Sequence, residues 1–336
     1  MSPPDPRANP LLLGHDGAEA TLAEAMRSGR MHHAWLLTGP AGVGKATLAF
    51  RFARRLLAGA PTGASLALDE REKVFRRVAA GSHADLLTVA REWDPKRKRL
   101  RGEIVVEDVR RVGAFLHLTP AEGGWRVVVV DGAEDLNRNA ANALLKVLEE
   151  PPPRAVLLLV CAAAGRLLPT IRSRCRRLRL GALDDAIVAD LLARYLPDAA
   201  EEERGRLVTL GEGSIGRALA LAEGGGVAVA DLVGGVLEAL PDLSAKRAHE
   251  VADALGRDED AFSLFMELLR AGLAAAVRGV ARGRADPDQA RLVGARPLAA
   301  WVDVWHGLSH LQHETEAFHL DKRQAILAGC ALLAGR

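Results

Sequence analysis

One glycine-rich segment constrains the fold of this chain more than any other feature. It reads Thr38-Gly-Pro-Ala-Gly-Val-Gly-Lys-Ala-Thr47, follows an apolar run and precedes a helical pattern at residues 48–57. A strand, a glycine-rich turn and a helix in this order form a phosphate-binding loop, because the glycines let backbone N–H groups face phosphate oxygens at a helix N-terminus. A structural turn with an exposed lysine is the alternative, which the strand, the spacing and the lysine together disfavour.

Continuous Val and Leu runs alternate with helical patterns over the first 180 residues. Such runs are typical of parallel strands that are buried on both faces. Their alternation with helices predicts an α/β domain with a doubly wound parallel sheet. The expected strands are Ala34–Thr38, Asp85–Val89, Arg126–Asp131, Ala155–Cys161 and Arg176–Leu180.

The rest of the chain is predicted to be helical. Three short helices are expected between residues 182 and 223, and Ser214 is the expected N-cap of the last one. From residue 227 the pattern is rich in Ala and Leu, with few turn signals. We therefore expect a flexible N-terminal arm at residues 1–10, an α/β nucleotide-binding-like domain at 11–180, a small helical domain at 181–224 and an all-α domain at 225–336.

Charge and cysteine content exclude several classes of protein. The formal net charge is only +2, so any contact with nucleic acid must come from local patches. The three cysteines lie far apart, which excludes a disulfide framework and a four-cysteine zinc site, and the histidines show no metal-ligand spacing. We expect no metal site, no zinc and no membrane segment, since no apolar run approaches the roughly 20 residues that span a bilayer. The expected location is cytoplasmic.

The phosphate loop predicts where ATP or ADP would contact the chain. Its glycines shape the backbone, Lys45 reaches the terminal phosphates, and an acid at the end of the strand at residues 126–131 lies where a metal ion would bind. The candidate nucleotide-binding residues are Gly39, Pro40, Gly42, Val43, Gly44, Lys45, Ala46, Thr47 and Asp131.

Ala46 and Gly132 depart from the pattern of an active ATPase. Ala46 stands where Ser or Thr normally binds Mg²⁺, and Thr47 cannot replace it, because one residue turns the side chain by roughly 100° around a helix. Gly132 follows Asp131, where an acid would orient the attacking water. We therefore expect weak Mg²⁺ binding.

The surrounding segments give no substitute for the missing acid. Glu134 is close in sequence, but we expect it to belong to the next helix and to face elsewhere. The following strand ends in Cys161-Ala-Ala-Ala164, where a polar side chain would contact the γ-phosphate. The chain alone is thus expected to hydrolyse little or no ATP.

Arg174 is the candidate catalytic residue, with Ser173 and Cys175 as its motif neighbours. It lies in a basic segment just before the last expected strand. An arginine at the edge of such a domain can enter a neighbour's nucleotide site and stabilise the charge on the transferring phosphoryl group. On composition alone, a solvated basic surface explains the segment equally well.

Four motifs together resemble those of the δ′ family of bacterial DNA polymerase III clamp-loader subunits. They are Gly39-Pro-Ala-Gly-Val-Gly-Lys45, Val130-Asp-Gly-Ala-Glu-Asp-Leu-Asn137, Asn139-Ala-Ala-Asn-Ala-Leu-Leu-Lys-Val-Leu-Glu-Glu-Pro-Pro152 and Leu168-Pro-Thr-Ile-Arg-Ser-Arg-Cys175. The resemblance covers residues 11–220 and is weak beyond them. It implies an AAA+ fold with a helical lid domain and a C-terminal collar domain that assembles a ring of five subunits.

The resemblance also implies partners and further site residues. Arg174 would be an arginine finger for an adjacent γ/τ motor subunit, and Arg217 would match the lid arginine, although an exposed helix arginine is the alternative. Asn142 and Lys146 would lie on the helix after the strand at residues 126–131 and contact DNA, and a structural or solvent-facing role explains them equally well. The δ subunit, the sliding clamp and primed DNA are the other implied partners. The family's zinc module has no counterpart, because residues 58–82 contain no cysteine.

Two other functions compete with this hypothesis of a non-hydrolysing clamp-loader subunit. A motor subunit of the same ring is disfavoured by Ala46 and Gly132. An unrelated P-loop enzyme would need a substrate pocket with catalytic residues of its own, which the sequence does not reveal.

Overall fold

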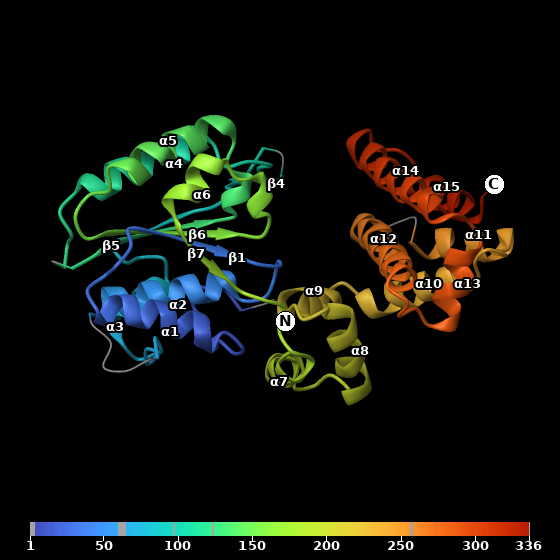
Figure 1. Ribbon diagram of the computed structural model, residues 1–336, viewed down its shortest axis with the longest axis horizontal. Coiled ribbons are helices and arrows are strands. Elements are labelled where there is room, and N and C mark those ends of the chain that lie inside the picture. Colours follow the sequence, from blue (N-terminus) through green and yellow to red (C-terminus); the bar gives the residue numbers. More distant parts are fainter. Residues whose placement is uncertain (1–3, 60–64, 97, 123, 256–257, 336) are drawn as a thin grey trace. The chain divides into compact units, whose positions relative to one another are not determined.

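Five parallel strands form the sheet that carries the glycine-rich loop (Figure 1). The computed structural model describes residues 4–59, 65–96, 98–122, 124–255 and 258–335. The strand order is β2-β5-β6-β1-β7, and every neighbouring pair is parallel. The strands are β1 (Ala34–Thr38), β2 (Leu86–Val89), β5 (Arg126–Asp131), β6 (Ala155–Cys161) and β7 (Arg176–Arg179). All five predicted strands are confirmed to within one residue at each end.

Helices cover both faces of this sheet, which is why β1 and β6 are buried along their whole length. Alternate side chains of β1 enter two separate cores: Trp35 packs on one face and Leu36 on the other. One face is covered by α1 (Asp16–Arg27), α2 (Lys45–Leu57) and α3 (Lys73–Ala79), the other by α4 (Val106–His117), α5 (Arg138–Glu149) and α6 (Pro169–Arg174) (Figure 1). The α/β parallel-sheet fold with a P-loop is therefore confirmed.

Smaller elements connect these layers. A two-stranded antiparallel ladder pairs β3 (Trp93–Asp94) with β4 (Arg99–Leu100). The 3₁₀ turns η1 (Ala133–Asp135) and η2 (Ala164–Arg166) follow β5 and β6. Each turn lies at the carboxyl end of a central strand, where ligands of open α/β sheets bind.

Three helices follow the sheet, as the sequence predicts. They are α7 (Asp185–Tyr195), α8 (Glu201–Gly211) and α9 (Ile215–Glu223). The Ser214 hydroxyl accepts a hydrogen bond from the Arg217 N–H at 3.1 Å, so Ser214 caps α9 as expected.

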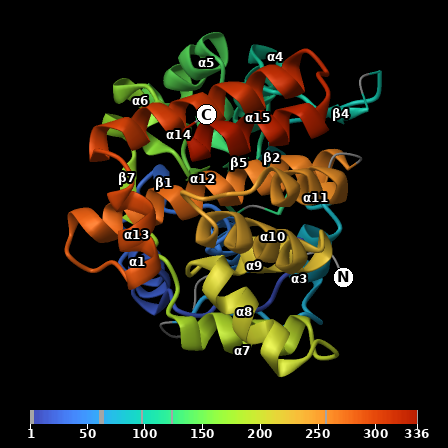
Figure 2. The ribbon, with the colours of Figure 1, turned by 90° about the vertical axis from the view of Figure 1, so that its right-hand side faces the viewer.

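The C-terminal region contains only helices among its described residues, which confirms the predicted change of structural class. They are α10 (Gly226–Glu238), α11 (Ala245–Leu255), α12 (Glu259–Ala281), α13 (Pro287–Gly294), α14 (Leu298–Ala317) and α15 (Lys322–Ala334), which can be followed in orange to red in Figure 2. The long helix α12 is central to this region and packs on α10, α13 and α14. Its side chains Phe262, Phe265 and Met266 are fully buried.

The chain divides into two compact units, Met1–Leu219 and Ala220–Arg336. The border falls inside α9, so the separate lid and collar domains expected from the sequence stay predictions. The flexibility of residues 1–10 also stays a prediction. Between residues 58 and 82 the chain contains α3, and residues 60–64 lie outside the described part.

The described residues contain neither a cluster of metal ligands nor a single helix of membrane-spanning length and apolarity. In this part of the chain, no three or more His, Cys, Asp or Glu side chains gather so that they could hold a metal ion. No helix within the described ranges is long and apolar enough to cross a membrane by itself; α9 and α10 pass that test only jointly, as a bent pair.

Candidate functional site

The glycine-rich loop joins β1 to α2 in a backbone path that only glycine allows. Gly39 has φ +147°, and a Cβ atom there would lie 2.0 Å from the carbonyl oxygen of Leu180. Gly42 has φ +72°, and its Cβ would lie 2.3 Å from the Ser214 hydroxyl oxygen. The loop is therefore packed against Leu180, which follows β7, and against the start of α9.

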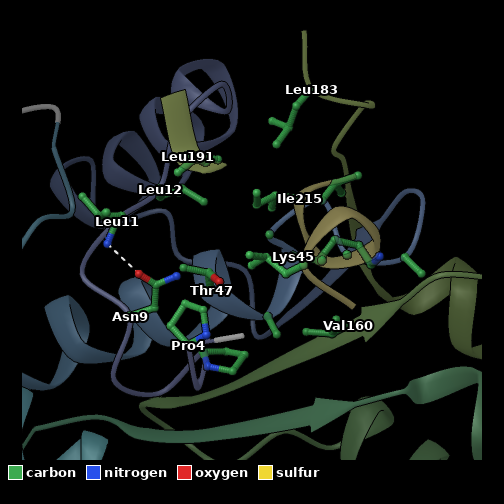
Figure 3. A pocket seen from close by; sticks show the side chains of 18 of the residues that line it. Pro4, Asn9, Leu11, Leu12, Lys45, Thr47, Val160, Leu183, Leu191 and Ile215 are labelled. Atoms are coloured by element: carbon green, nitrogen blue, oxygen red, sulfur yellow. Dashed lines mark hydrogen bonds between the residues drawn. The ribbon is translucent and has the colours of Figure 1, made fainter. Parts of the chain in front are cut away.

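A cavity of about 380 Å³ opens beside this loop (Figure 3). It is within the range of 300–1,000 Å³ that is typical of small-molecule sites. Residues 41–47 of the loop line it, together with the ends of β5 and β6. Of the predicted nucleotide-binding residues, Gly39, Pro40 and Arg217 are not among the described residues that line the cavity.

Residues near the N-terminus and the helices α7 and α9 complete the wall. The apolar side chains of Leu12, Leu191 and Ile215 lie around the cavity in Figure 3. Asn9 also lines it, and its side-chain amide donates to the Tyr195 hydroxyl at 3.2 Å. An apolar wall next to a phosphate loop suits a nucleoside, whose base needs a hydrophobic contact.

Arg54 holds the N-terminal segment in place. Its guanidinium is buried and donates to the carbonyl oxygens of Arg7 and Asn9, at 2.6 and 2.8 Å. Burial lowers the pKa of Arg54 to about 10, with a contribution from the like charge of Arg51. The described part of the expected N-terminal arm thus forms one side of the cavity.

Lys45 makes contacts inside its own loop. Its ammonium group donates to the carbonyl oxygens of Gly39 and Pro40, at 2.9 and 2.5 Å, and the residue is only 5% exposed. Burial lowers the pKa of Lys45, while the negative charges of Glu134 and Asp131 oppose that shift. A nucleotide phosphate would have to draw this ammonium away from two carbonyl groups.

The next carbonyl groups of the loop are also hydrogen-bonded. Ala41 accepts from the Ser214 hydroxyl and Gly42 from the Gly216 N–H, both at 2.9 Å. Val43 accepts from the His15 Nε2–H at 2.7 Å.

Gly44 accepts from the Leu48 N–H at 2.9 Å, as the first hydrogen bond of α2. Every carbonyl from residue 39 to 44 therefore has a partner in this chain. These contacts hold the loop in one conformation, which is the preorganisation a phosphate site needs. The contacts with α9 and Lys45 also satisfy its carbonyl groups without a ligand.

The predicted metal-binding positions lie in the cavity wall. Asp131 ends β5, and burial raises its pKa, with a further rise from the charge of Glu134 and an opposing effect of Lys45. Ala46 and Thr47 both line the cavity, and Ala46 has no hydroxyl to offer a cation. The donor set for Mg²⁺ is therefore poor at the position that usually supplies an oxygen ligand.

The prediction for Glu134 was wrong. This residue lies in η1, lines the cavity, and accepts the Ala162 N–H on Oε1 at 2.7 Å. The reason is the left-handed conformation of Gly132 (φ +80°), which starts a separate 3₁₀ turn directly after β5. The helix begins only at Arg138, where the Asn137 side chain caps it. Glu134 is the site residue that the sequence pattern missed.

Arg174 lies apart from this cavity, at the end of α6. Its Nη2 forms an ion pair with Oε1 of Glu149 at 2.7 Å, and its Nη1 donates to the Thr170 carbonyl at 3.1 Å. The Arg174 side chain keeps 36% of its surface exposed. The Ser173 hydroxyl donates to the same Thr170 carbonyl, and burial raises the pKa of Cys175 to about 12. Both motif neighbours therefore act in local structure.

Arg217 and the exposed residues of α5 occupy other surfaces. Arg217 forms an ion pair with Glu212 at 3.2 Å, near the start of α9. Asn142 and Lys146 line a groove between α4 and α5, together with Arg110 and Glu150. The contact of Arg217 with nucleotide stays a prediction, and so does any contact of this groove with DNA.

A sequence model of the family described as "DNA polymerase III, delta subunit" matches residues 14–184. The matched segment contains the phosphate loop, the end of β5 and Arg174. This is slightly more than half of the chain, and it lies within the region of the sequence resemblance, residues 11–220.

Curated relatives of the chain are also named as DNA polymerase III subunits. The chain is 41% identical over 182 residues to DNA polymerase III subunit delta′ of Pseudomonas aeruginosa, covering 54% of this chain and 53% of the relative. Identity to subunit delta′ of Escherichia coli is 36% over 203 residues, covering 60% and 58%. Subunit tau of Salmonella typhimurium is 31% identical over 272 residues, covering 78% of this chain and 40% of the relative. The chain thus spans about half the length of the curated relatives that it matches.

Among solved structures, a γ-subunit-related protein of Thermotoga maritima aligns with 94% of this chain and 99% of its own. The identity is 18% and the TM-score 0.47.

Proposed function

Because the chain belongs to the DNA polymerase III delta-subunit family, we propose that it is a δ′-like clamp-loader subunit that supplies Arg174 to a neighbouring ATPase. In this role it acts as a stator in a ring with δ and γ/τ subunits, and the ring loads the sliding clamp onto primed DNA. Residues 181–224 serve as a lid and residues 225–336 as the collar that holds the ring together.

The position of Arg174 carries this proposal. Its guanidinium is outside the cavity of its own chain, partly exposed, and held by Glu149 and the Thr170 carbonyl in a fixed direction. A guanidinium has five N–H donors, so these two contacts leave donors for phosphate oxygens of another subunit. An arginine supplied in this way is worth on the order of 10³–10⁵ in the rate of phosphoryl transfer.

The cavity in this chain supports a nucleotide site that does not hydrolyse ATP. ATP or ADP fits the P-loop class of site, with Arg217 as a lid contact, but Ala46 offers no oxygen to Mg²⁺. Gly132 carries no acid to orient water, and Glu134 Oε1 is already engaged by the Ala162 N–H. Hydrolysis needs a metal ion and an oriented water together, so the chain alone should turn over little ATP.

The test is Arg174→Ala in the reconstituted complex. Hydrolysis at the adjacent motor site should fall on the order of 10³-fold or more, because the transition-state charge loses its partner. Arg177→Ala is the matched control, since Arg177 is an exposed arginine of the same basic segment on β7. An unchanged rate in the Arg174→Ala complex, with intact assembly, would remove the arginine-finger role.

A motor subunit is the second candidate function. Glu134 favours it, since this carboxylate lies in the cavity beside Lys45 and Asp131. Under that hypothesis the isolated chain hydrolyses ATP, and primed DNA accelerates the reaction. Under the stator proposal, ATP turnover by the isolated chain stays at the background rate with and without DNA.

A further inference from the structure

The two carboxylate oxygens of Glu134, a residue of the phosphate-loop cavity, have different surroundings. One oxygen, Oε1, accepts the Ala162 backbone N–H at 2.7 Å. The other, Oε2, is shielded from solvent and accepts no N–H or O–H of the described residues, and the Cys161 thiol lies beside this carboxylate. An oxygen in this position is costly, because it has lost water without gaining a strong hydrogen bond. Its position therefore calls for an explanation beyond local structure.

Ala162 marks the place where Glu134 is held. This residue directly follows β6, the strand that lies between β5 and β1, and it lines the cavity. A polar side chain that contacts the γ-phosphate belongs at this strand end, and here the chain has alanine instead. The group that fills this end of the cavity is the carboxylate of Glu134, bound to a backbone N–H as a phosphate oxygen would be.

The charges around the cavity agree with this placement. Lys45 is the only cationic side chain among the described residues that line it, whereas Asp131 and Glu134 are both acidic. Glu134 is the acid whose charge acts most strongly on Lys45, ahead of Asp131. The ammonium group that would meet a terminal phosphate thus already has a neighbouring anion.

We propose that Glu134 occupies the terminal-phosphate position of the cavity and makes it select a nucleoside diphosphate over a triphosphate. The inference rests on the proposed function only in taking the P-loop cavity as a nucleotide site. A γ-phosphate would bring negative charge next to a partly buried carboxylate, where repulsion is less screened than in open solvent. A diphosphate ends one phosphate earlier and leaves Glu134 on the Ala162 N–H.

The experiment is titration of the full chain with ATP and ADP, each with and without Mg²⁺, for the wild type and Glu134→Gln. Glutamine keeps an oxygen for the Ala162 N–H and removes the charge. The affinity for ATP relative to ADP should rise about tenfold in Glu134→Gln, the size expected for relief of one partly buried like-charge contact. Asp135→Asn is the matched control, because it removes an acid of the same 3₁₀ turn that pairs with Arg91 and does not line the cavity.

Three results would overturn the proposal. They are an unchanged ATP-to-ADP ratio in Glu134→Gln, no detectable binding of either nucleotide to that variant, and a loss of Mg²⁺-dependent ATP binding, which would make Glu134 a metal ligand. Glu134→Ala, checked by thermal unfolding, decides the matter where the glutamine variant does not fold. The Arg174→Ala test scores hydrolysis by a neighbouring subunit, so either idea can fail without the other.

Discussion

The two regions of this chain that we propose for phosphate contacts differ in how their polar groups are satisfied. In the loop at residues 39–44 every carbonyl is bonded to the chain itself, and Lys45 is almost fully buried. Arg174, in contrast, is a partly exposed cation held by one exposed carboxylate and one carbonyl. The polar groups of the first region are satisfied by the chain itself, whereas the second keeps part of its guanidinium exposed. This difference is what the proposed role of Arg174 in a neighbouring site requires.

Gly39→Ala should give the largest change in stability. The new Cβ would clash with the Leu180 carbonyl, in a conformation that side chains rarely adopt, so we expect a loss of about 3 kcal/mol or more in the free energy of unfolding. Urea unfolding measures it. Gly17→Ala in α1 is the control, since nothing lies within 4 Å of its Cβ and the helix should gain up to about 1 kcal/mol. Equal effects would mean that the loop is not tightly packed.

Glu149→Gln should change the second region by a smaller amount. An acid at the C-terminal end of α5 opposes the helix dipole, so its placement there indicates a role, which we assign to holding Arg174. An exposed ion pair is worth about 0.2–1 kcal/mol, so hydrolysis by the complex should slow by a factor of about 1.4 to 5. The effect should vanish in an Arg174→Ala background.

Glu150→Gln is the matched control for this pair, because Glu150 is the next acid along the chain and lies at the groove between α4 and α5. If Glu149→Gln slows hydrolysis equally in the presence and absence of Arg174, Glu149 acts through something other than the arginine.

Asp131→Asn probes the acids of the phosphate-loop cavity. Burial and the charge of Glu134 raise the pKa of Asp131, so folding favours its protonated form. The stability that protonation contributes is present below the ordinary pKa of 3.8 and is lost as the pH rises through the raised value. Asparagine carries no proton to lose, so the variant should be more stable than the wild type at neutral pH and lose that gain below pH 3.8. Denaturant unfolding at both pH values measures the difference. A variant that is less stable at neutral pH would show that the charged carboxylate is needed there.

The fold could be predicted from the sequence, because the residues that indicate each strand or helix lie within that element. Runs such as Val127–Val130 are apolar at every position, and only strands covered on both faces tolerate that. The glycine-rich segment fixed β1 and α2 for the same reason. The change to an all-helical chain followed from the composition after residue 180.

The candidate site could be predicted only in part, because many of its contacts join segments that are far apart in the sequence. Nothing near Ser214 or His15 indicates that they bond to the loop carbonyls of Ala41 and Val43. Glu134 was misplaced because its direction depends on the positive φ of Gly132, which places η1 before the helix. The glycine directly after the apolar strand was the one feature of the sequence that could have predicted this turn.

The most direct test of the account compares two alanine variants of this one chain in the same assembled complex. Lys45→Ala removes the cation of the first region, and Arg174→Ala removes the cation of the second. If this chain is a stator that supplies Arg174, Lys45→Ala leaves ATP hydrolysis by the complex unchanged, whereas Arg174→Ala lowers it at the adjacent site on the order of 10³-fold or more. Hydrolysis that depends on Lys45 and not on Arg174 would contradict this role.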